Sequence, residues 1–133
     1  MILVDSSIWI DYFNGARNPQ TDRLDTLLAN ADNELGVADL VVFEVMRGFP
    51  SHRAKERAQT LLLSTRVLEI GGLANALLAA EHYSALRALG YTVRSPIDVL
   101  QASYCIRHGH MLLHRDADFD VMAALRGLQI APH

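Results

Sequence analysis

The chain has 133 residues, of which 50% are hydrophobic and 20% charged, and its formal net charge is −3 at pH 7. This composition excludes an intrinsically disordered chain, and the length favours a single domain over residues 1–133. The acidic balance argues against a protein held on nucleic acid mainly by a basic surface. No apolar run approaches the ~18 residues of a membrane span, and we expect a cytoplasmic protein. The single cysteine, Cys105, excludes an internal disulfide framework and a cysteine-based zinc cluster.

Short apolar runs alternate with longer amphipathic segments along most of the chain. Capping residues and glycines mark the boundaries between them. In chain order we predict a strand at 1–4, helices at 8–13 and 20–31, a strand at 34–37, helices at 40–47 and 52–64, a strand at 66–70, helices at 73–89 and 95–108, a strand at 111–113, a helix at 118–125 and a strand at 128–130. This alternation predicts an α/β fold with a mostly parallel central sheet and helices on both faces.

Local patterns give more detailed expectations for two helices. Asp39 is expected to cap the helix over residues 40–47, and that helix should be mostly buried because Glu44 is the only polar residue in its first seven positions. Ser95, followed by Pro96 and by Asp98 three positions after the serine, matches a capping box at the start of the helix over residues 95–108.

Four acidic residues lie on four separate segments at places where a ligand site is expected. Asp5 follows the first predicted strand directly, and Asp116 lies three residues after the strand that ends at residue 113. Asp98 is in the first turn of its helix, and Glu44 projects from an apolar helix. Because ligands of open α/β sheets bind outside the carboxyl ends of the strands, these four acids could converge on one edge of the sheet.

Each acid also has a purely structural explanation when it is considered alone. Asp5 is a suitable helix cap, and Asp98 fits the capping box with Ser95. Glu44 and Arg47 have the spacing of an ion pair on one helix. The argument for a functional site therefore depends on the joint placement of the acids.

Four segments of the chain, in this order, resemble the sequence motifs of PIN domains. They are Ile2-Leu3-Val4-Asp5-Ser6-Ser7, Phe43-Glu44-Val45-Met46-Arg47-Gly48, Asp98-Val99-Leu100-Gln101-Ala102 and Leu112-Leu113-His114-Arg115-Asp116-Ala117-Asp118-Phe119. Their order, their spacing and the total length are similar to those of the VapC toxin subfamily. The resemblance covers essentially the whole chain.

The resemblance implies a metal-dependent endoribonuclease that is the toxin of a type II toxin–antitoxin pair and hydrolyses RNA with metal-activated water. By resemblance, the catalytic metal site comprises Asp5, Glu44, Asp98 and Asp116, with Asp118 as a further metal ligand. Oxygen ligands of this kind suit Mg²⁺ or Mn²⁺ and do not suit zinc. The implied partners are an RNA substrate, a cognate antitoxin and a second copy of the chain in a homodimer.

Three further residues are expected to support this site. The Ser6 hydroxyl is expected to hold Asp5 or a coordinated water, and Arg47 to orient Glu44 or to bind antitoxin or RNA. His114 stands where the family commonly carries threonine or serine near the metal. It could serve as a ligand, a hydrogen-bond donor or a phosphate contact, or it could be an ordinary loop histidine.

Two other functions are compatible with an acidic α/β domain. The first is a catalytically weak or inactive PIN scaffold that binds RNA or a partner. The second is a phosphoacceptor domain of the receiver type, which would need adjacent acids after the first strand and a late lysine. The chain has Asp5 followed by two serines, and Lys55 is its only lysine, so the receiver interpretation is weak.

Other candidates for chemistry have structural interpretations. The aromatic residues Trp9, Tyr12 and Phe13 are expected in the core or at an interface, and Cys105 is expected to be a buried helix residue.

Overall fold

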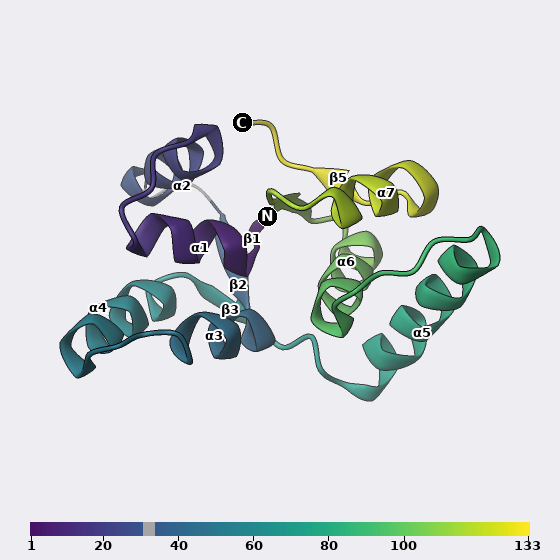
Figure 1. The fold of residues 1–133 in the computed structure, drawn as a ribbon, viewed down its shortest axis with the longest axis horizontal. Helices are drawn as coiled ribbons and strands as arrows, with labels where there is room; N and C mark the ends of the chain where they lie inside the picture. Colours follow the sequence, from purple (N-terminus) through teal and green to yellow (C-terminus); the bar gives the residue numbers. More distant parts are fainter. Residues whose placement is uncertain (31–33) are drawn as a thin grey trace.

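The computed structural model describes residues 1–30 and 34–133 of the chain. Within these ranges the elements are β1 (Ile2–Val4), α1 (Ser6–Phe13), α2 (Pro19–Ala29), β2 (Leu35–Ala38), α3 (Asp39–Met46), α4 (His52–Leu63), β3 (Arg66–Leu68), α5 (Leu73–Ala88), α6 (Pro96–His108), β4 (Met111–Leu113), α7 (Ala117–Arg126) and β5 (Gln129–Ile130) (Figure 1). The predicted alternation of strands and helices is confirmed. The helix predicted at residues 20–31 ends at Ala29, and residue 31 lies outside the described ranges.

The strands form one parallel sheet in the order β3-β2-β1-β4-β5. Leu3 in β1 is in register with Gly36 of β2 on one side and with Leu112 of β4 on the other. β1 is therefore the central strand, and its carboxyl end lies beside the carboxyl end of β4. This order brings together the segments that follow β1 and β4, although more than 100 residues separate them in the chain.

Helices cover both faces of the sheet, as the sequence predicted. In Figure 1 the helices α1 to α4 lie on one side of the strands and α5 to α7 on the other. Side chains of a strand alternate between its faces, so Leu3 joins the core cluster under α5, α6 and α7 while Val4 joins the cluster under α1, α2 and α3. Leu112 and Leu113 of β4 divide between the two clusters in the same way.

Asp39 does not cap α3 as the sequence suggested. Ala38 is the N-cap residue, and Asp39 is the first residue of the helix. The Asp39 carboxylate accepts hydrogen bonds from the backbone N–H of Leu40 at 2.8 Å and of Ile70 at 3.0 Å. The second bond ties the start of α3 to the segment that follows β3.

The prediction of a mostly buried α3 is also wrong. Val41 and Val45, one helical turn apart, are buried, but the Phe43 side chain is 57% exposed. A helix packed on one side can bury only one stripe of its surface, whatever the polarity of its other residues. The capping box of α6 is likewise absent, because the Ser95 side chain makes no capping hydrogen bond. Asp98 is therefore not engaged in the local structure that would have explained it.

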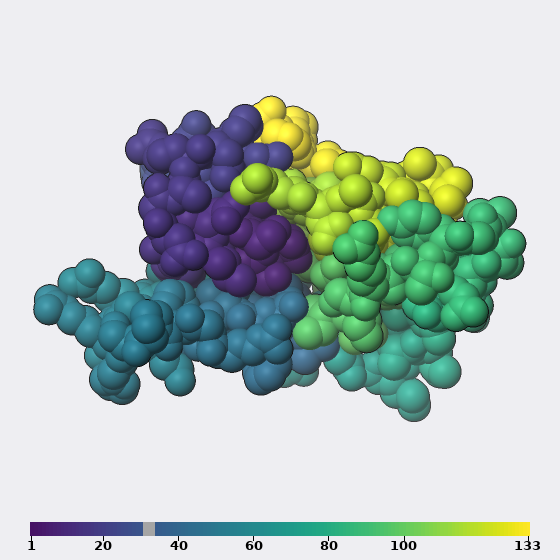
Figure 2. Space-filling view, viewed as in Figure 1, coloured from purple at the N-terminus to yellow at the C-terminus, as the bar shows by residue number. Residues whose placement is uncertain are grey.

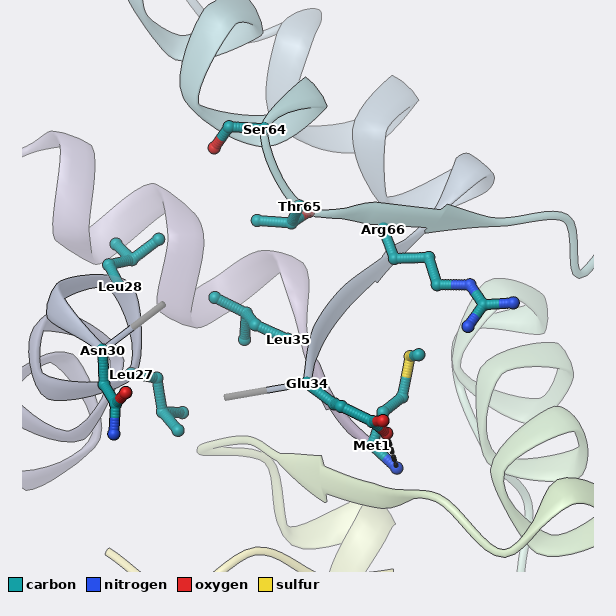
Figure 3. Close-up of a pocket in the computed structure, with 9 residues that line it drawn as sticks. All are labelled: Met1, Leu27, Leu28, Asn30, Glu34, Leu35, Ser64, Thr65 and Arg66. Carbon is teal, nitrogen blue, oxygen red and sulfur yellow. Dashed lines mark ion pairs between the residues drawn. The ribbon is translucent and has the colours of Figure 1, made fainter. Parts of the chain in front are cut away.

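A pocket of about 320 Å³ lies at the amino ends of β1, β2 and β3. Figure 3 shows Leu27 and Leu28 on its wall, with the Arg66 side chain and the ion pair between Glu34 and the N-terminal amine at its other end. The strands run parallel, so this pocket is at the opposite edge of the sheet from the segments that carry Asp5 and Asp116.

None of the helices in residues 1–30 and 34–133 is long and apolar enough to cross a membrane.

Gly36→Ala is expected to destabilise the fold by about 1–3 kcal/mol, because the new methyl group would overpack the sheet. A Cβ atom at this position would lie 2.8 Å from Met1 Sδ and 3.2 Å from the Arg66 carbonyl oxygen. Urea denaturation followed by circular dichroism measures the change. Gly48→Ala is the matched control, because its Cβ would meet only the Val45 carbonyl oxygen at 3.7 Å. Equal stability of the two variants would contradict this reading of the packing.

Candidate metal centre

Asp5 is the N-cap residue of α1 and is held from two elements. Its Oδ2 atom accepts hydrogen bonds from the Ser7 hydroxyl at 2.7 Å and from the Ser7 backbone N–H at 3.3 Å. Its Oδ1 atom accepts a hydrogen bond from Gln101 Nε2 of α6 at 3.0 Å. The Asp5 residue is only 4% exposed. The hydroxyl that bonds Asp5 is therefore that of Ser7, so the alternative in which Ser6 holds Asp5 is wrong, while a contact of Ser6 with a coordinated water stays a prediction.

Asp116 and Asp118 lie between β4 and the first turn of α7. Asp116 is the N-cap residue of α7 and accepts a hydrogen bond from the Asp118 backbone N–H at 2.9 Å. The Asp118 side chain is buried and accepts hydrogen bonds from the Tyr91 hydroxyl and, at 3.4 Å, from the Arg94 backbone N–H. The bond to Asp118 raises the pKa of the Tyr91 phenol, which keeps its proton and acts as the donor.

Asp98 joins these two acids from the first turn of α6. One carboxylate oxygen of each of Asp98, Asp116 and Asp118 lies within 4.8 Å of the others. Burial raises the pKa of Asp98 to about 8, and the negative charges of the neighbouring acids, Asp5 foremost, act in the same direction. A carboxyl group with this pKa is mostly protonated at pH 7 unless a positive charge is brought to it.

Glu44 approaches the same group of acids from α3. Burial raises its pKa, the charge of Asp5 raises it further, and a hydrogen bond from the Ser6 hydroxyl opposes the shift. Glu44 Oε1 is buried and has no hydrogen-bond partner among the described residues. Ser6 therefore contacts the site through Glu44.

Arg47 is exposed, and its guanidinium lies over the Phe43 ring, 5.4 Å from the ring centroid. Its charge lowers the pKa of Glu44, which is a smaller influence than burial. Among the described residues, the close ion pairs do not include one between Arg47 and Glu44. The simple helix ion pair considered for these two residues is therefore absent.

The arrangement of the acids fits a hard divalent cation. Their segments border one another at the centre of the face in Figure 2, where purple α1, blue α3, green α6 and the yellow-green segment after β4 meet. Carboxylates crowded in this way destabilise one another unless a cation neutralises them. The unpartnered Glu44 Oε1 and the raised pKa of Asp98 are the features that such a cation would relieve. Mg²⁺ and Mn²⁺ prefer oxygen ligands of this kind.

His114 is a buried residue that fixes the backbone of the segment after β4. It is 5% exposed, and its ring centroid lies 5.0 Å from that of Phe119. Its Nδ1 atom accepts a hydrogen bond from the Asp116 backbone N–H at 3.0 Å, so the ring proton of the neutral imidazole is on Nε2. Nε2 lies 3.4 Å from Asp120 Oδ1, on the other side of the ring. The interpretation as a partly exposed loop histidine is wrong, because the residue is buried.

His114→Ala is expected to destabilise the protein by about 1–3 kcal/mol, because it leaves the Asp116 N–H without its acceptor. His114→Asn should lose less, since the asparagine side-chain oxygen can take the place of Nδ1. Thermal and urea unfolding of both variants measure the difference. Equal losses would indicate that the packing of the ring against Phe119 dominates.

The residues given structural interpretations behave as expected. Trp9 is fully buried and stacks with Phe13, with 5.9 Å between the ring centroids. Cys105 is fully buried, and burial raises the pKa of its thiol to about 12, so a thiolate nucleophile is excluded at neutral pH.

The residues that hold the acids were largely missed by the sequence reasoning. They are Ser7, Gln101, Tyr91 and Arg94. Ser7 was within the quoted motif, and Gln101 lies one helical turn after Asp98, which places both on one face of α6. Neither feature shows that these side chains bind Asp5, and no feature of the sequence indicated that Tyr91 or Arg94 binds Asp118.

Comparison with known proteins identifies the family. Residues 2–125 match the PIN domain. The chain is 33% identical over 131 residues to ribonuclease VapC11 of Mycobacterium tuberculosis and to VapC ribonuclease Mb1587 of Mycobacterium bovis, with 98% of each chain covered.

Solved structures share the fold. VapBC2 from Rickettsia felis, bound to a DNA fragment from its promoter, matches with a TM-score of 0.73 and 18% identity, covering 98% of both chains. FitAcB from Neisseria gonorrhoeae matches with a TM-score of 0.74 and 18% identity, covering 99% of this chain and 97% of the other. The chain therefore belongs to the PIN-domain family and is a VapC-type member of it.

Proposed function

We propose that this protein is a metal-dependent endoribonuclease and the toxin of a type II toxin–antitoxin pair. The observation that carries the proposal is the group formed by Asp98, Asp116 and Asp118, whose carboxylates have oxygens within 4.8 Å of one another. Asp5 and Glu44 lie close enough for their charges to raise the pKa of Asp98. The relatives at 33% identity that are named ribonucleases support the choice of RNA as substrate.

In this proposal Asp5, Glu44, Asp98 and Asp116 hold Mg²⁺, or Mn²⁺ in its place, and Asp118 completes the group. The bound cation would polarise the phosphodiester and activate the attacking water. The acids alone would repel a phosphodiester, so the substrate can approach only when their charge is neutralised. Without these four acids the formal charge of the chain would be +1, which is compatible with RNA binding.

The chain's own residues fix the orientation of the carboxylates before the substrate arrives. Ser7 and Gln101 hold both oxygens of Asp5, and the Ser6 hydroxyl holds Glu44. Groups that are already oriented need little rearrangement during the reaction, and this preorganisation accounts for much of the electrostatic part of catalysis.

The proposed partners follow from the same family and from two exposed apolar side chains, one on α1, which Asp5 caps, and one on α3, which carries Glu44. Phe43 of α3 is 57% exposed and Ile10 of α1 is 40% exposed. We propose that a cognate antitoxin and a second copy of the chain cover apolar surfaces of this kind, and that the protein acts in the cytoplasm as one domain over residues 1–133.

The experiment that tests the proposal is cleavage of total RNA by the purified protein with Mg²⁺, with Mn²⁺ or with a chelator. Asp5→Asn is the control, because asparagine can still cap α1 but carries no charge. Discrete fragments that require the cation and disappear with the variant would support the proposal. Equal cleavage by both proteins would indicate a contaminating nuclease and count against it.

A PIN scaffold that binds RNA or a partner without cutting is the alternative. His114, where threonine or serine is common, is the feature that favours it. Thermal stabilisation by Mg²⁺ without cleavage of any RNA would support this alternative and reject the enzyme.

A further inference from the structure

The segment between α5 and α6 contacts the group of acids through Asp118. It belongs to none of the four motifs that resemble those of PIN domains. It begins at Gly90, whose φ of +85° ends α5 in the left-handed region that glycine adopts without strain. The Gly90 N–H donates to the Arg87 carbonyl, and the Tyr91 N–H donates to the Leu86 carbonyl, both at 2.9 Å. These two bonds form a Schellman motif, so the end of α5 fixes the backbone position of Tyr91.

Two side chains of this segment are packed in the core. The Tyr91 ring packs against the core cluster under α5, α6 and α7, and Val93 of the same cluster is 4% exposed. Figure 1 shows the segment running past α7 before it enters α6. A tyrosine held in this way can present its hydroxyl at a fixed point beside the start of α7.

Both oxygens of Asp118 are bound from this segment. The Tyr91 hydroxyl donates to Oδ1, and the Arg94 backbone N–H donates to Oδ2 at 3.4 Å. Asp118 itself is 7% exposed and lies within the group that contains Asp98 and Asp116. The Asp116 and Asp118 carboxylates have oxygens within 4.8 Å of each other, and their repulsion would turn the Asp118 carboxylate away if nothing held it.

We propose that Tyr91 is a positioning residue of the metal centre, holding the Asp118 carboxylate in the orientation in which the acids receive a divalent cation. This inference rests on the proposed function. Groups that orient metal ligands by hydrogen bonds commonly change metal affinity by 10–100-fold when they are removed. A hydroxyl that served the fold alone would change stability and leave the affinity for the cation unaltered.

The test compares Tyr91→Phe with Tyr83→Phe in the full-length protein. Tyr83 is a matched control, because its ring packs against the same core cluster and lies near Arg87. The probe is Mn²⁺ alone, titrated calorimetrically and by the loss of its free-ion electron paramagnetic resonance signal, so the readout does not depend on RNA cleavage. We expect Tyr91→Phe to raise the Mn²⁺ dissociation constant about 10-fold and Tyr83→Phe to leave it unchanged.

The Asp118→Asn background separates positioning from an unrelated effect on the fold. There, Tyr91→Phe should change the Mn²⁺ dissociation constant no further, because the carboxylate that it positions is gone. An unchanged dissociation constant for Tyr91→Phe in the native background, or an equal loss in both backgrounds, would overturn the role of Tyr91. Failure of the wild-type protein to bind Mn²⁺ would overturn the proposed metal centre as well, so the two failures are distinguishable.

Discussion

Asp98→Asn is expected to reduce Mg²⁺-dependent RNA cleavage by about 100-fold or more and, at the same time, to stabilise the cation-free protein at pH 8. The loss of activity follows from the proposed role, because a metal site contributes several kcal/mol to transition-state stabilisation and each 1.4 kcal/mol is about tenfold in rate. The gain in stability follows from the surroundings of Asp98, which is 8% exposed and faces four other acids.

The size of the stability gain comes from the raised pKa of Asp98. The folded-state value of about 8 stands against an ordinary value of 3.8, and one pKa unit corresponds to about 1.4 kcal/mol. At pH 8 the folded protein must therefore either hold a proton on Asp98 or tolerate a buried charge. An asparagine amide also loses hydration on burial, so we expect the variant to gain on the order of 3 kcal/mol and not the full difference.

Two measurements on the same preparations test these opposite effects. Cleavage of an RNA substrate is followed with saturating Mg²⁺, and urea unfolding is followed at pH 8 in the presence of a chelator. Asp22→Asn is the control, because Asp22 is an exposed acid of α2 that lies 3.6 Å from Arg17 and is not among the acids that act on Asp98. A variant that is less stable than the wild type, or that cleaves normally, would contradict the placement of Asp98 in a functional group of acids.

The sequence predicted the position of the acids because that position depends on topology. Parallel strands place the residues that follow them at one edge, so Asp5 and Asp116 come together once β1 and β4 are known to be neighbours. The alternation of apolar runs with helices was enough to predict this type of sheet.

The orientation of the acidic side chains could not be predicted from the sequence, because their hydrogen-bond partners depend on tertiary geometry. Ser6 and Ser7 are adjacent and chemically identical, yet their hydroxyls bind different acids, Glu44 and Asp5 respectively. The partner of Asp118 is Tyr91, 27 positions earlier, on a segment for which the sequence predicted no helix or strand.

Local rules failed where a tertiary contact competes with them. Asp39 is used to tie α3 to Ile70 and not to cap the helix. Ser95 and Asp98 have the spacing of a capping box, but no such bond forms, and Asp98 lies among the other acids. Rules of local structure are expected to fail at functional sites, and the absent capping box at Asp98 agrees with a function for this group of acids.

The cation-free protein is expected to lose stability as the pH rises from about 4 to about 8. The pKa of Asp98 is higher in the folded than in the unfolded protein, and so is that of Glu44. Between the two values the folded state binds more protons, so the free energy of unfolding falls with pH. The contribution of Asp98 is fully present below about 3.8 and is lost as the pH rises through about 8. The free energy of unfolding in urea is measured at each pH for the wild type and for Asp98→Asn. The difference between the two values separates the contribution of Asp98 from that of the other carboxyl groups.

Mn²⁺ should reverse that loss, because the cation binds the ionised acids and competes with their protons. Stabilisation by a ligand that binds only the folded state is about 2.7 kcal/mol when its concentration is 100 times the dissociation constant. The increase in melting temperature on adding Mn²⁺ should therefore be larger at pH 8 than at pH 5, where a proton already neutralises Asp98. An increase that is equal at both pH values, or that persists in Asp98→Asn, would mean that the cation binds elsewhere. The dependence on both pH and Asp98 thus connects the cation to this group of acids without relying on an RNA substrate.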